Sequence, residues 1–346
     1  MFLAALPLTA APRAEFIYEE APFPSCHAST IVETQPGEFL AAWFGGSAEG
    51  RPDVAIWAAR KAAGKWSAPF ELAREPHIAA YNPVLFFSRD GVLWFYYKFG
   101  PSPSSWTAAR RASRDRGLTW SPVEHLPAGL YGPIKDKPLV LPDGTIVSGT
   151  SVESYHSWAC WVERSTDNGR TWTRHGPIAA TPAGPRAHTA NAPLPPVPGV
   201  EEWNRTSGII QPAIVPLAGR LRMFVRSTRD IGRICYADSR DAGVTWTQAQ
   251  PTSLPNPNSG IDAVALRDGR ILLVYNHSEN GRTPLNLAVS RDGDHWKMFL
   301  ALESDPGEYS YPAIIQSADG NVHVTYTWNR RKIRHVEVPL AEVPEP

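Results

Sequence analysis

Six polar residues occupy equivalent positions in six related segments of the chain, each directly before an apolar, strand-like stretch. They are His27, Asn82, Lys137, Gln211, Asp262 and Tyr311. An imidazole, a phenol, a carboxylate and two amides in one column can transfer protons and hydrogen-bond to hydroxyl-rich ligands. Because buried polar groups cost free energy unless they are paired, the column predicts a ligand-binding or catalytic centre. The alternative is a water-filled channel whose polar ends bond one another.

Charged side chains follow at a second recurring position, at the ends of the next strand-like stretches and in the loops after them. The strand ends carry Lys98, Arg226 and Asn276, and the loops carry Glu49, Arg51, Asp53, Glu153 and Arg282. A guanidinium can hold a carboxylate through two parallel hydrogen bonds, so Arg226 and Arg282 are predicted to bind an anionic, hydroxyl-rich ligand such as an acidic sugar. The further binding residues predicted are Lys137, Asn82, Asp262, Arg51, Lys98 and Asn276.

An internal repeat defines the elements that must position these residues. The pattern S-x-D-x-G-x-T-W occurs as SRDRGLTW (113–120), STDNGRTW (165–172) and SRDAGVTW (239–246), with degenerate copies ending at Trp66 and Trp296. Its Asp and Ser side chains are predicted to hydrogen-bond the backbone of a turn, while its glycine supplies a left-handed conformation. We therefore interpret the octapeptide as structural rather than catalytic.

Hairpin signals, each a turn glycine followed by alternating apolar residues, recur six times at a spacing of roughly 50 residues. The glycines are Gly37, Gly91, Gly144, Gly219, Gly269 and Gly320. Each repeat predicts four strands, which in the first are ASTIVET, EFLAAWFGG, DVAIWAAR and WSAPFELA. Units of four strands at this period are typical of β-propeller blades. The sequence thus predicts an all-β, six-bladed β-propeller with four-stranded antiparallel blades.

One propeller domain is predicted to span residues 15–346. Its last repeat ends after the third strand, KIRHVEV, and the N-terminal segment AEFIYEE is expected to supply the fourth. A Pro-rich stretch at 181–205 is interpreted as a long loop insertion. The apolar stretch 1–14 is interpreted as the remnant of a signal peptide, which predicts a periplasmic or secreted protein, with the cytoplasm as the alternative.

Composition excludes several classes of function. Lys and Arg together number 34, as do Asp and Glu, so no basic face indicates nucleic-acid binding. No apolar run has the 18 or so residues of a membrane helix. The three cysteines, Cys26, Cys160 and Cys235, have no metal-site spacing and are expected to be buried thiols, with one disulfide as the alternative. Neither a metal nor a cofactor is predicted, and the charged tail WNRRKIRHVEV is expected to be solvated.

The repeated octapeptide, the four-stranded units and the six-fold organisation resemble the sialidase (neuraminidase) superfamily, in particular its bacterial members with BNR or Asp-box repeats. The resemblance covers nearly the whole chain. It implies Asp-box turns and an exo-acting glycoside hydrolase that cleaves a terminal, sialic-acid-like sugar. The same octapeptide also occurs in propellers that are not sialidases, so it indicates architecture more strongly than activity.

The resemblance also implies roles for particular residues. Sialidases hold the substrate carboxylate with three arginines and use a tyrosine nucleophile paired with a glutamate, together with an aspartate as acid and base. They form an exception to the two-carboxylate scheme of most glycosidases. In this chain the stretch EYSYPAII offers Tyr309 or Tyr311 as the tyrosine. Arg226 and Arg282 match two of the arginines. Asp53, with Glu49 as its rival, matches the aspartate.

Two positions depart from the family pattern. His27 stands where the first arginine of sialidases normally opens the first blade, and Gln211 stands where the glutamate partner of the tyrosine normally opens the fourth. An amide cannot accept the phenolic proton as a base. Three hypotheses therefore stay open: a sialidase-like hydrolase, a polysaccharide lyase or rhamnosidase that uses His27 with Tyr311, and a non-catalytic carbohydrate-binding propeller.

Overall fold

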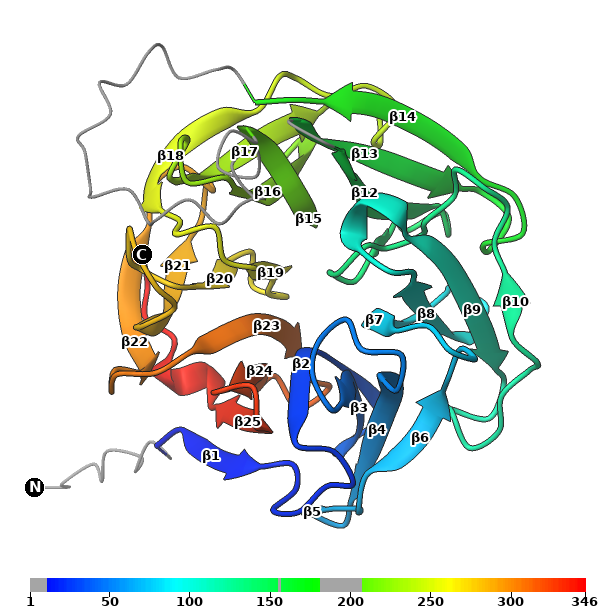
Figure 1. Cartoon of the computed structure of the whole chain (residues 1–346). Coiled ribbons are helices and arrows are strands. Elements are labelled where there is room, and N and C mark those ends of the chain that lie inside the picture. The colour runs from blue at the N-terminus through cyan, green and yellow to red at the C-terminus, as the bar shows by residue number, and fades with distance from the viewer. Residues whose placement is uncertain (1–10, 155–156, 181–206) are drawn as a thin grey trace, which may run out of the picture.

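The computed structural model describes residues 11–154, 157–180 and 207–346. The described chain is built of strands and turns, together with two three-residue 3-10 helices at Pro103–Ser105 and Leu340–Glu342. The sheets surround a common centre, and the chain passes from one to the next around it (Figure 1). The prediction of an all-β protein is confirmed. The predicted insertion at 181–205 and most of the predicted signal-peptide remnant lie outside the described residues.

Two sheets form the first part of the chain. In the first sheet the predicted strands are present, but the predicted strand WSAPFELA is divided between two short strands. The first contains β2 (Ser25–Gln35), β3 (Glu38–Gly46), β4 (Ala55–Ala62), β5 (Lys65–Trp66) and β6 (Phe70–Ala73). The second contains β7 (Ala80–Phe87), β8 (Leu93–Phe99), β9 (Thr107–Ser113) and β10 (Glu124–His125).

The middle of the chain forms an eight-stranded sheet that consists of two antiparallel groups. One group is β11 (Leu139–Val140), β12 (Ile146–Ser154), β13 (Ser157–Ser165) and β14 (Thr173–Ile178). The other is β15 (Ser207–Leu217), β16 (Arg220–Ser227), β17 (Arg233–Ser239) and β18 (Gln250–Pro255). The groups are joined by a short parallel pairing in which Ser157 lies opposite Ser207 and Trp158 opposite Gly208. Since the two groups share one sheet, the number of blades stays a prediction.

The last two sheets complete the arrangement. One contains β19 (Asp262–Ala265), β20 (Ile271–Tyr275), β21 (Leu285–Ser290) and β22 (Lys297–Glu303). The other contains β23 (Tyr309–Gln316), β24 (Val322–Trp328) and β25 (Lys332–Val338), and its fourth strand is β1 (Arg13–Phe16). β1 pairs antiparallel with β25, with Arg13 opposite Glu337 and Phe16 opposite Arg334 (Figure 1). The pairing predicted between the two ends of the chain is therefore present.

The octapeptide turns contain the predicted hydrogen bonds. In the turn after β17, Gly243 N donates to Ser239 Oγ at 2.8 Å and Thr245 N donates to Asp241 Oδ1 at 2.8 Å. Gly243 has a φ of 88°, the left-handed conformation that glycine adopts without steric cost. Trp246 Nε1 donates back to Gly243 O at 3.0 Å. The octapeptides at 113–120 and 165–172 repeat the bonds from glycine N to serine and from threonine N to aspartate.

Neighbouring sheets pack against each other through their apolar faces. These cores lie along the middle of the strands, with the octapeptide turns at one end. Ile56 and Phe95 are fully buried in one such core, and Trp120 packs edge-on against Phe95 with ring centroids 5.8 Å apart. The three cysteines are free and buried in these cores, as expected for structural thiols. The tight packing fixes the sheets relative to one another and so fixes the loops at their ends.

Four of the innermost strands carry a β-bulge near their beginning. Register shifts interrupt β2, β7, β15 and β23, and in each the first unpaired residue has a positive φ. These residues are Ala28, Asn82, Gln211 and Tyr311. A bulge bends the strand and re-aims a side chain, and bulges are over-represented next to active sites. The structure therefore places Ala28, not His27, at the position of Asn82, Gln211 and Tyr311, which corrects the sequence column by one residue.

Candidate active site

A basic pocket of about 460 Å³ opens at the end of the sheets that carries the loops between second and third strands. Its lining residues are Arg226, Arg229, Pro257, Asn258, Gly281, Arg282, Gly307, Glu308 and Arg330. The volume lies within the range of roughly 300–1,000 Å³ typical of small-molecule sites. Four guanidinium groups against one carboxylate make this a pocket for an anion.

Tyr311 lies close to both of the arginines that are predicted to bind an anionic ligand, Arg226 and Arg282. Arg226 Nη1 donates to Tyr311 Oη at 2.8 Å, and the Arg226 and Arg282 guanidinium carbons lie 5.6 and 5.7 Å from the centre of the phenol ring. Gln211 Nε2 also donates to Tyr311 Oη, at 3.3 Å. Both of these groups donate to the phenolic oxygen, and no described residue accepts the phenolic proton. That proton is therefore free to pass to a ligand or a water molecule beside the two arginines.

Arg226 is held from two further sides. Its Nε donates to Asn258 Oδ1 at 2.7 Å and its Nη1 to Gln211 Oε1 at 3.2 Å. Only 7 % of Arg226 is exposed. Asn258 itself has a φ of 63° in the segment before β19, a conformation that Asn tolerates better than most residues. These contacts fix the guanidinium before any ligand arrives, which lowers the entropic cost of binding.

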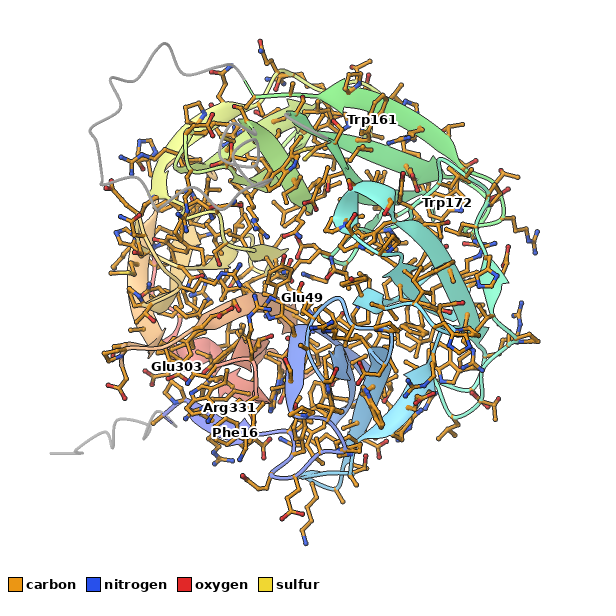
Figure 2. All side chains as sticks on the ribbon, in the orientation of Figure 1. Phe16, Glu49, Trp161, Trp172, Glu303 and Arg331 are labelled. Atoms are coloured by element: carbon orange, nitrogen blue, oxygen red, sulfur yellow. The ribbon has the colours of Figure 1, made fainter. Side chains whose placement is uncertain are left out.

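A chain of ion pairs joins three loops at the pocket. Glu308 Oε1 accepts from Arg282 Nη1 and from Arg330 Nε, each at 2.9 Å. Arg330 also pairs with Glu49, which follows β3 and points to the inner side of the ring (Figure 2). Burial lowers the pKa of Arg282, and the neighbouring Arg226 adds to this effect. This chain of ion pairs is itself neutral, with two arginines against two glutamates, so the net positive charge of the pocket comes from Arg226 and Arg229.

His27 lies on the other side of Tyr311, with ring centroids 4.3 Å apart. The imidazole is 2 % exposed, and its Nδ1 has no hydrogen-bond partner among the described residues. Burial, followed by the positive charges of Arg330, Arg282 and Arg226, holds the pKa of His27 well below its usual value. The ring is therefore neutral at neutral pH and cannot replace an arginine as an anion ligand.

Tyr309 and Asn276 lie outside the pocket lining, where they support the Arg282 loop. Tyr309 is 2 % exposed, and its backbone N donates to Arg282 O at 3.1 Å. Asn276 Nδ2 donates to Arg282 O at 2.8 Å, to Pro284 O at 3.0 Å and to Tyr309 O at 3.0 Å. Of the two candidate tyrosines, Tyr311 is the one whose hydroxyl contacts the arginines.

Three other residues of the predicted column form hydrogen bonds or ion pairs with groups of other strands and loops near the centre of the sheets. Lys137 Nζ pairs with Asp262 Oδ2 at 2.9 Å, and the same carboxylate oxygen accepts from Ile314 N at 2.8 Å. Asn82 Nδ2 donates to Ile134 O at 3.1 Å. These contacts tie neighbouring sheets together near the centre. None of the three side chains lines the pocket.

Lys98 is fully buried, and its Nζ has no partner among the described residues. Burial lowers the pKa of Lys98 to about 7, against the opposing attraction of Glu163. Lys98 pairs with Tyr81 across the β7–β8 register, as Arg226 pairs with Ile210 across β15–β16. Lys98 and Arg226 thus occupy equivalent positions in their sheets, but of the two only Arg226 lines the pocket.

The charged residues of the loop after β3 differ in their surroundings and in their contacts with the pocket residues. Asp53 is exposed, and its carboxylate accepts from Ser47 N and from Ser47 Oγ, each at 2.8 Å. The hydrogen bond from the Ser47 side chain is the main cause that lowers the pKa of Asp53. Arg51 is exposed in the same loop. Glu49 joins the ion-pair chain, whereas neither Asp53 nor Arg51 lines the pocket.

Sequence reasoning missed Arg330 and Asn258. Arg330 was expected to be solvated within the charged tail, but its side chain is 34 % exposed and lines the pocket. The signal was available, since Arg330 follows the second strand of its repeat as Glu49 and Arg282 follow theirs. Asn258 lies in a turn whose sequence does not reveal its partner.

Comparison with solved structures places the fold among the sialidases. A protein of unknown function from Dyadobacter fermentans superposes with a TM-score of 0.74 at 16% identity, covering 96% of this chain and 99% of that one. The NanB sialidase of Streptococcus pneumoniae gives a TM-score of 0.72 at 13% identity, covering 95% and 71%. The Trypanosoma rangeli sialidase in complex with the inhibitor DANA gives 0.71 at 11% identity, covering 95% and 60%. At these identities the likeness shows the fold alone.

The protein is thus an all-β, sialidase-like protein with a propeller-like arrangement of sheets. The family described as BNR repeat-like domain matches residues 37–324, and the chain belongs to this family. The resemblance inferred from the octapeptides is therefore confirmed at the level of the superfamily. No protein of curated function matches the sequence significantly. None of the described residues forms a helix long and apolar enough to span a bilayer.

Proposed function

We propose that the chain is an exo-acting, sialidase-like glycoside hydrolase that removes a terminal acidic sugar from glycans. The observation that carries the proposal is the convergence of Arg226 and Arg282, which both line the basic pocket, on the neighbouring Tyr311. Guanidinium groups fixed in advance suit a carboxylate, and the adjoining phenol suits a reacting carbon beside that carboxylate. The pocket volume of about 460 Å³ fits one sugar residue rather than a long chain.

In this proposal Arg226, Arg282 and Arg330 bind the sugar carboxylate, and Arg330 provides the third guanidinium that position 27 lacks. Tyr311 is the nucleophile or the proton relay at the reacting carbon. A neutral phenol is a suitable nucleophile because it is not repelled by the carboxylate of the substrate, whereas a carboxylate nucleophile would be. Gln211 and Asn258 orient the Tyr311–Arg226 pair. Asp53 and Glu49 stay predicted acid–base candidates.

The scaffold proposed for this site is a single six-bladed propeller over residues 15–346 with Asp-box turns. Supporting this count, the eight-stranded sheet divides into two four-stranded groups at its short parallel link, which gives six groups of strands. The hydrogen bonds of the octapeptide turns support the Asp-box assignment. Export to the periplasm or the medium, indicated by residues 1–14, is part of the same proposal.

The decisive experiment incubates the purified chain with sialosides, uronides and rhamnosides and identifies the products by mass. The proposal expects release of an acidic monosaccharide with the mass of one added water. The double variant Arg226→Ala/Tyr311→Phe is the control for contaminating activity. Binding of acidic glycans without any turnover would instead support a carbohydrate-binding protein.

A second candidate, a uronate lyase, is favoured by the stacking of His27 on Tyr311 at 4.3 Å. In this reaction a base removes a proton next to the carboxylate and an acid protonates the leaving oxygen, which leaves a carbon–carbon double bond. The products then lack the added water and absorb ultraviolet light, so the same mass analysis separates the two reactions. The neutral state of the buried imidazole is compatible with a base.

A further inference from the structure

Glu153 stands at the topological position that supplies three of the four arginines of the pocket, Arg229, Arg282 and Arg330. It lies near the end of β12, before the connection between the second and third strands of its sheet. The corresponding connections of other sheets supply Glu49, Arg282 and Arg330. The sequence predicts Glu153 among these charged loop residues, and neither the anion-binding arginines nor Tyr311 accounts for it.

Contacts of β12 place the strand end that carries Glu153 beside Gln211, which contacts both Arg226 and Tyr311. Ser151 Oγ accepts from Gln211 N at 3.3 Å, so the end of β12 borders the bulge that aims Gln211 at Tyr311. Residues two apart on a strand share a face, so Glu153 follows Ser151 on that side. The carboxyl group interacts electrostatically with Arg226 and Glu49, which belong to the pocket and its ion-pair chain.

The other carboxylates near the pocket are already engaged. Glu308 pairs with two arginines, Glu49 with Arg330, and Asp262 with Lys137. Asp53 accepts two hydrogen bonds from Ser47, which lower its pKa and make it a poor proton donor. The carboxyl group of Glu153, by contrast, has no hydrogen bond or ion pair with any described residue.

The surroundings of Glu153 favour its protonated form. Burial is the main cause that raises the pKa of Glu153 to about 7, and the charge of Glu49 acts in the same direction. Arg226 opposes them, and the thiol of Cys160 on β13 is the other titratable group that interacts with it. A carboxyl group that is partly protonated near neutral pH is suited to general acid catalysis.

We propose that Glu153 is the proton donor to the leaving group, a role that rests on the proposed hydrolase function. Glu153 gives its proton to the glycosidic oxygen as the carbon–oxygen bond breaks, and the alcohol leaves. A water molecule then supplies the hydroxyl group to the anomeric carbon and returns a proton to the Glu153 carboxylate. The sum is hydrolysis, and it holds whether water attacks directly or after capture of the sugar by Tyr311.

The test compares Glu153→Gln and Asp53→Asn on two substrates with the same acidic sugar, one with an alkyl and one with a nitrophenyl leaving group. The matched control is Glu279→Gln, because the Glu279 side chain is 74 % exposed and, among the described residues, forms an ion pair only with Arg233. We expect Glu153→Gln to lower kcat on the alkyl glycoside roughly 10²–10⁴-fold. The loss on the nitrophenyl glycoside should be much smaller because that leaving group needs no proton.

The pH profile provides the readout that a structural role would not change. Wild-type kcat on the alkyl glycoside should fall as the pH rises through about 7, and this fall should disappear in Glu153→Gln. Glu153→Asp, which keeps a carboxyl group, should retain it at a lower rate. The role of Glu153 is overturned, and the hydrolase function is not, if Glu153→Gln is fully active. The same holds if the decrease of kcat at alkaline pH disappears in Asp53→Asn instead. A wild-type chain that hydrolyses no substrate overturns the hydrolase function and this role together.

Discussion

Arg226 Nη1 lies 2.8 Å from Tyr311 Oη and donates to it, so the phenol accepts from a guanidinium rather than donating to a base. Gln211, where a glutamate would take the phenolic proton, donates to the same oxygen at 3.3 Å. The substitution therefore reverses the hydrogen bond at this position. A phenolic oxygen with two donors is stabilised as negative charge develops on it, which is the requirement for a nucleophile or proton relay.

Tyr311→Phe removes the hydroxyl group and keeps the ring that packs against His27 and the two arginines. We expect kcat to fall by roughly 10²–10⁴-fold, since the hydroxyl acts in the transition state, while KM changes little. Steady-state kinetics on the sialoside or uronide that the wild type cleaves will measure both constants. Unchanged thermal unfolding would show that the fold is intact, and an unchanged kcat would exclude Tyr311 from the chemistry.

Arg330→Gln should weaken binding of an acidic sugar, because it removes one of the guanidinium groups around Glu308. Loss of a charge-assisted hydrogen bond costs about 1.5–3 kcal/mol, which is about 10–150-fold in Kd. Arg331→Gln is the control from the same turn, since Arg331 is exposed and lies away from the ring centre (Figure 2). Calorimetric titration of both variants should show the loss only for Arg330. Equal losses in both would indicate a general charge effect.

Sequence patterns predicted the strands well because each repeat carries its own turn glycine and alternating apolar face. The strand KIRHVEV, for example, coincides with β25. They failed where geometry depends on a bulge, since Ala28 has no polar side chain to mark the bulged position and His27 was aligned in its place. They also missed Arg330, because a charge in a short turn looks solvated until the neighbouring sheet is placed beside it.

Glu15 on β1 links its own sheet, which contains β25, to the neighbouring sheet of β2–β6. Its Oε1 accepts from Lys61 Nζ at 2.6 Å, from Trp66 Nε1 at 3.0 Å and contacts His335 Nδ1 at 3.0 Å. The hydrogen bond with His335 is the largest cause that lowers the pKa of Glu15 from 4.5 to about 2. A carboxyl group with a lowered folded-state pKa contributes stability above its unfolded value, and this is lost as the pH falls.

Glu15→Gln should therefore unfold at a lower temperature than the wild type at neutral pH. The difference should shrink as the pH falls from 4.5 towards 2, where the wild-type carboxylate also takes up its proton. Thermal unfolding of both proteins across this range measures the effect. Glu19→Gln is the control, because the Glu19 side chain is 76 % exposed and Lys332 is its only ion-pair partner in the part of the chain that the structure describes. A pH-independent difference would contradict the ionic origin of the contribution.

Asp241→Asn tests whether an octapeptide turn has only a structural role. Asn can accept the hydrogen bonds of one carboxylate oxygen, but it cannot also accept from Thr245 Oγ1 at the second oxygen. We expect a lower Tm with kcat and KM unchanged. A variant that keeps its Tm and loses activity would show that this turn contributes to catalysis.

His27→Phe separates the hydrolase from the lyase. Phe keeps an aromatic ring against Tyr311 but removes the nitrogen that a lyase would need as its base. If the chain is a hydrolase, kcat/KM should stay within about tenfold of the wild type, whereas loss of a general base would cost roughly 10²–10⁴-fold.

The His27→Phe variant should also lose part of the acid sensitivity of folding. Because the folded-state pKa of His27 lies well below 6.5, the unfolded wild type takes up a proton that the folded state does not, and its stability falls as the pH drops below 6.5. Thermal unfolding of wild type and His27→Phe on both sides of that pH measures this difference, and a wild type no more acid-sensitive than the variant would contradict the neutral, buried imidazole.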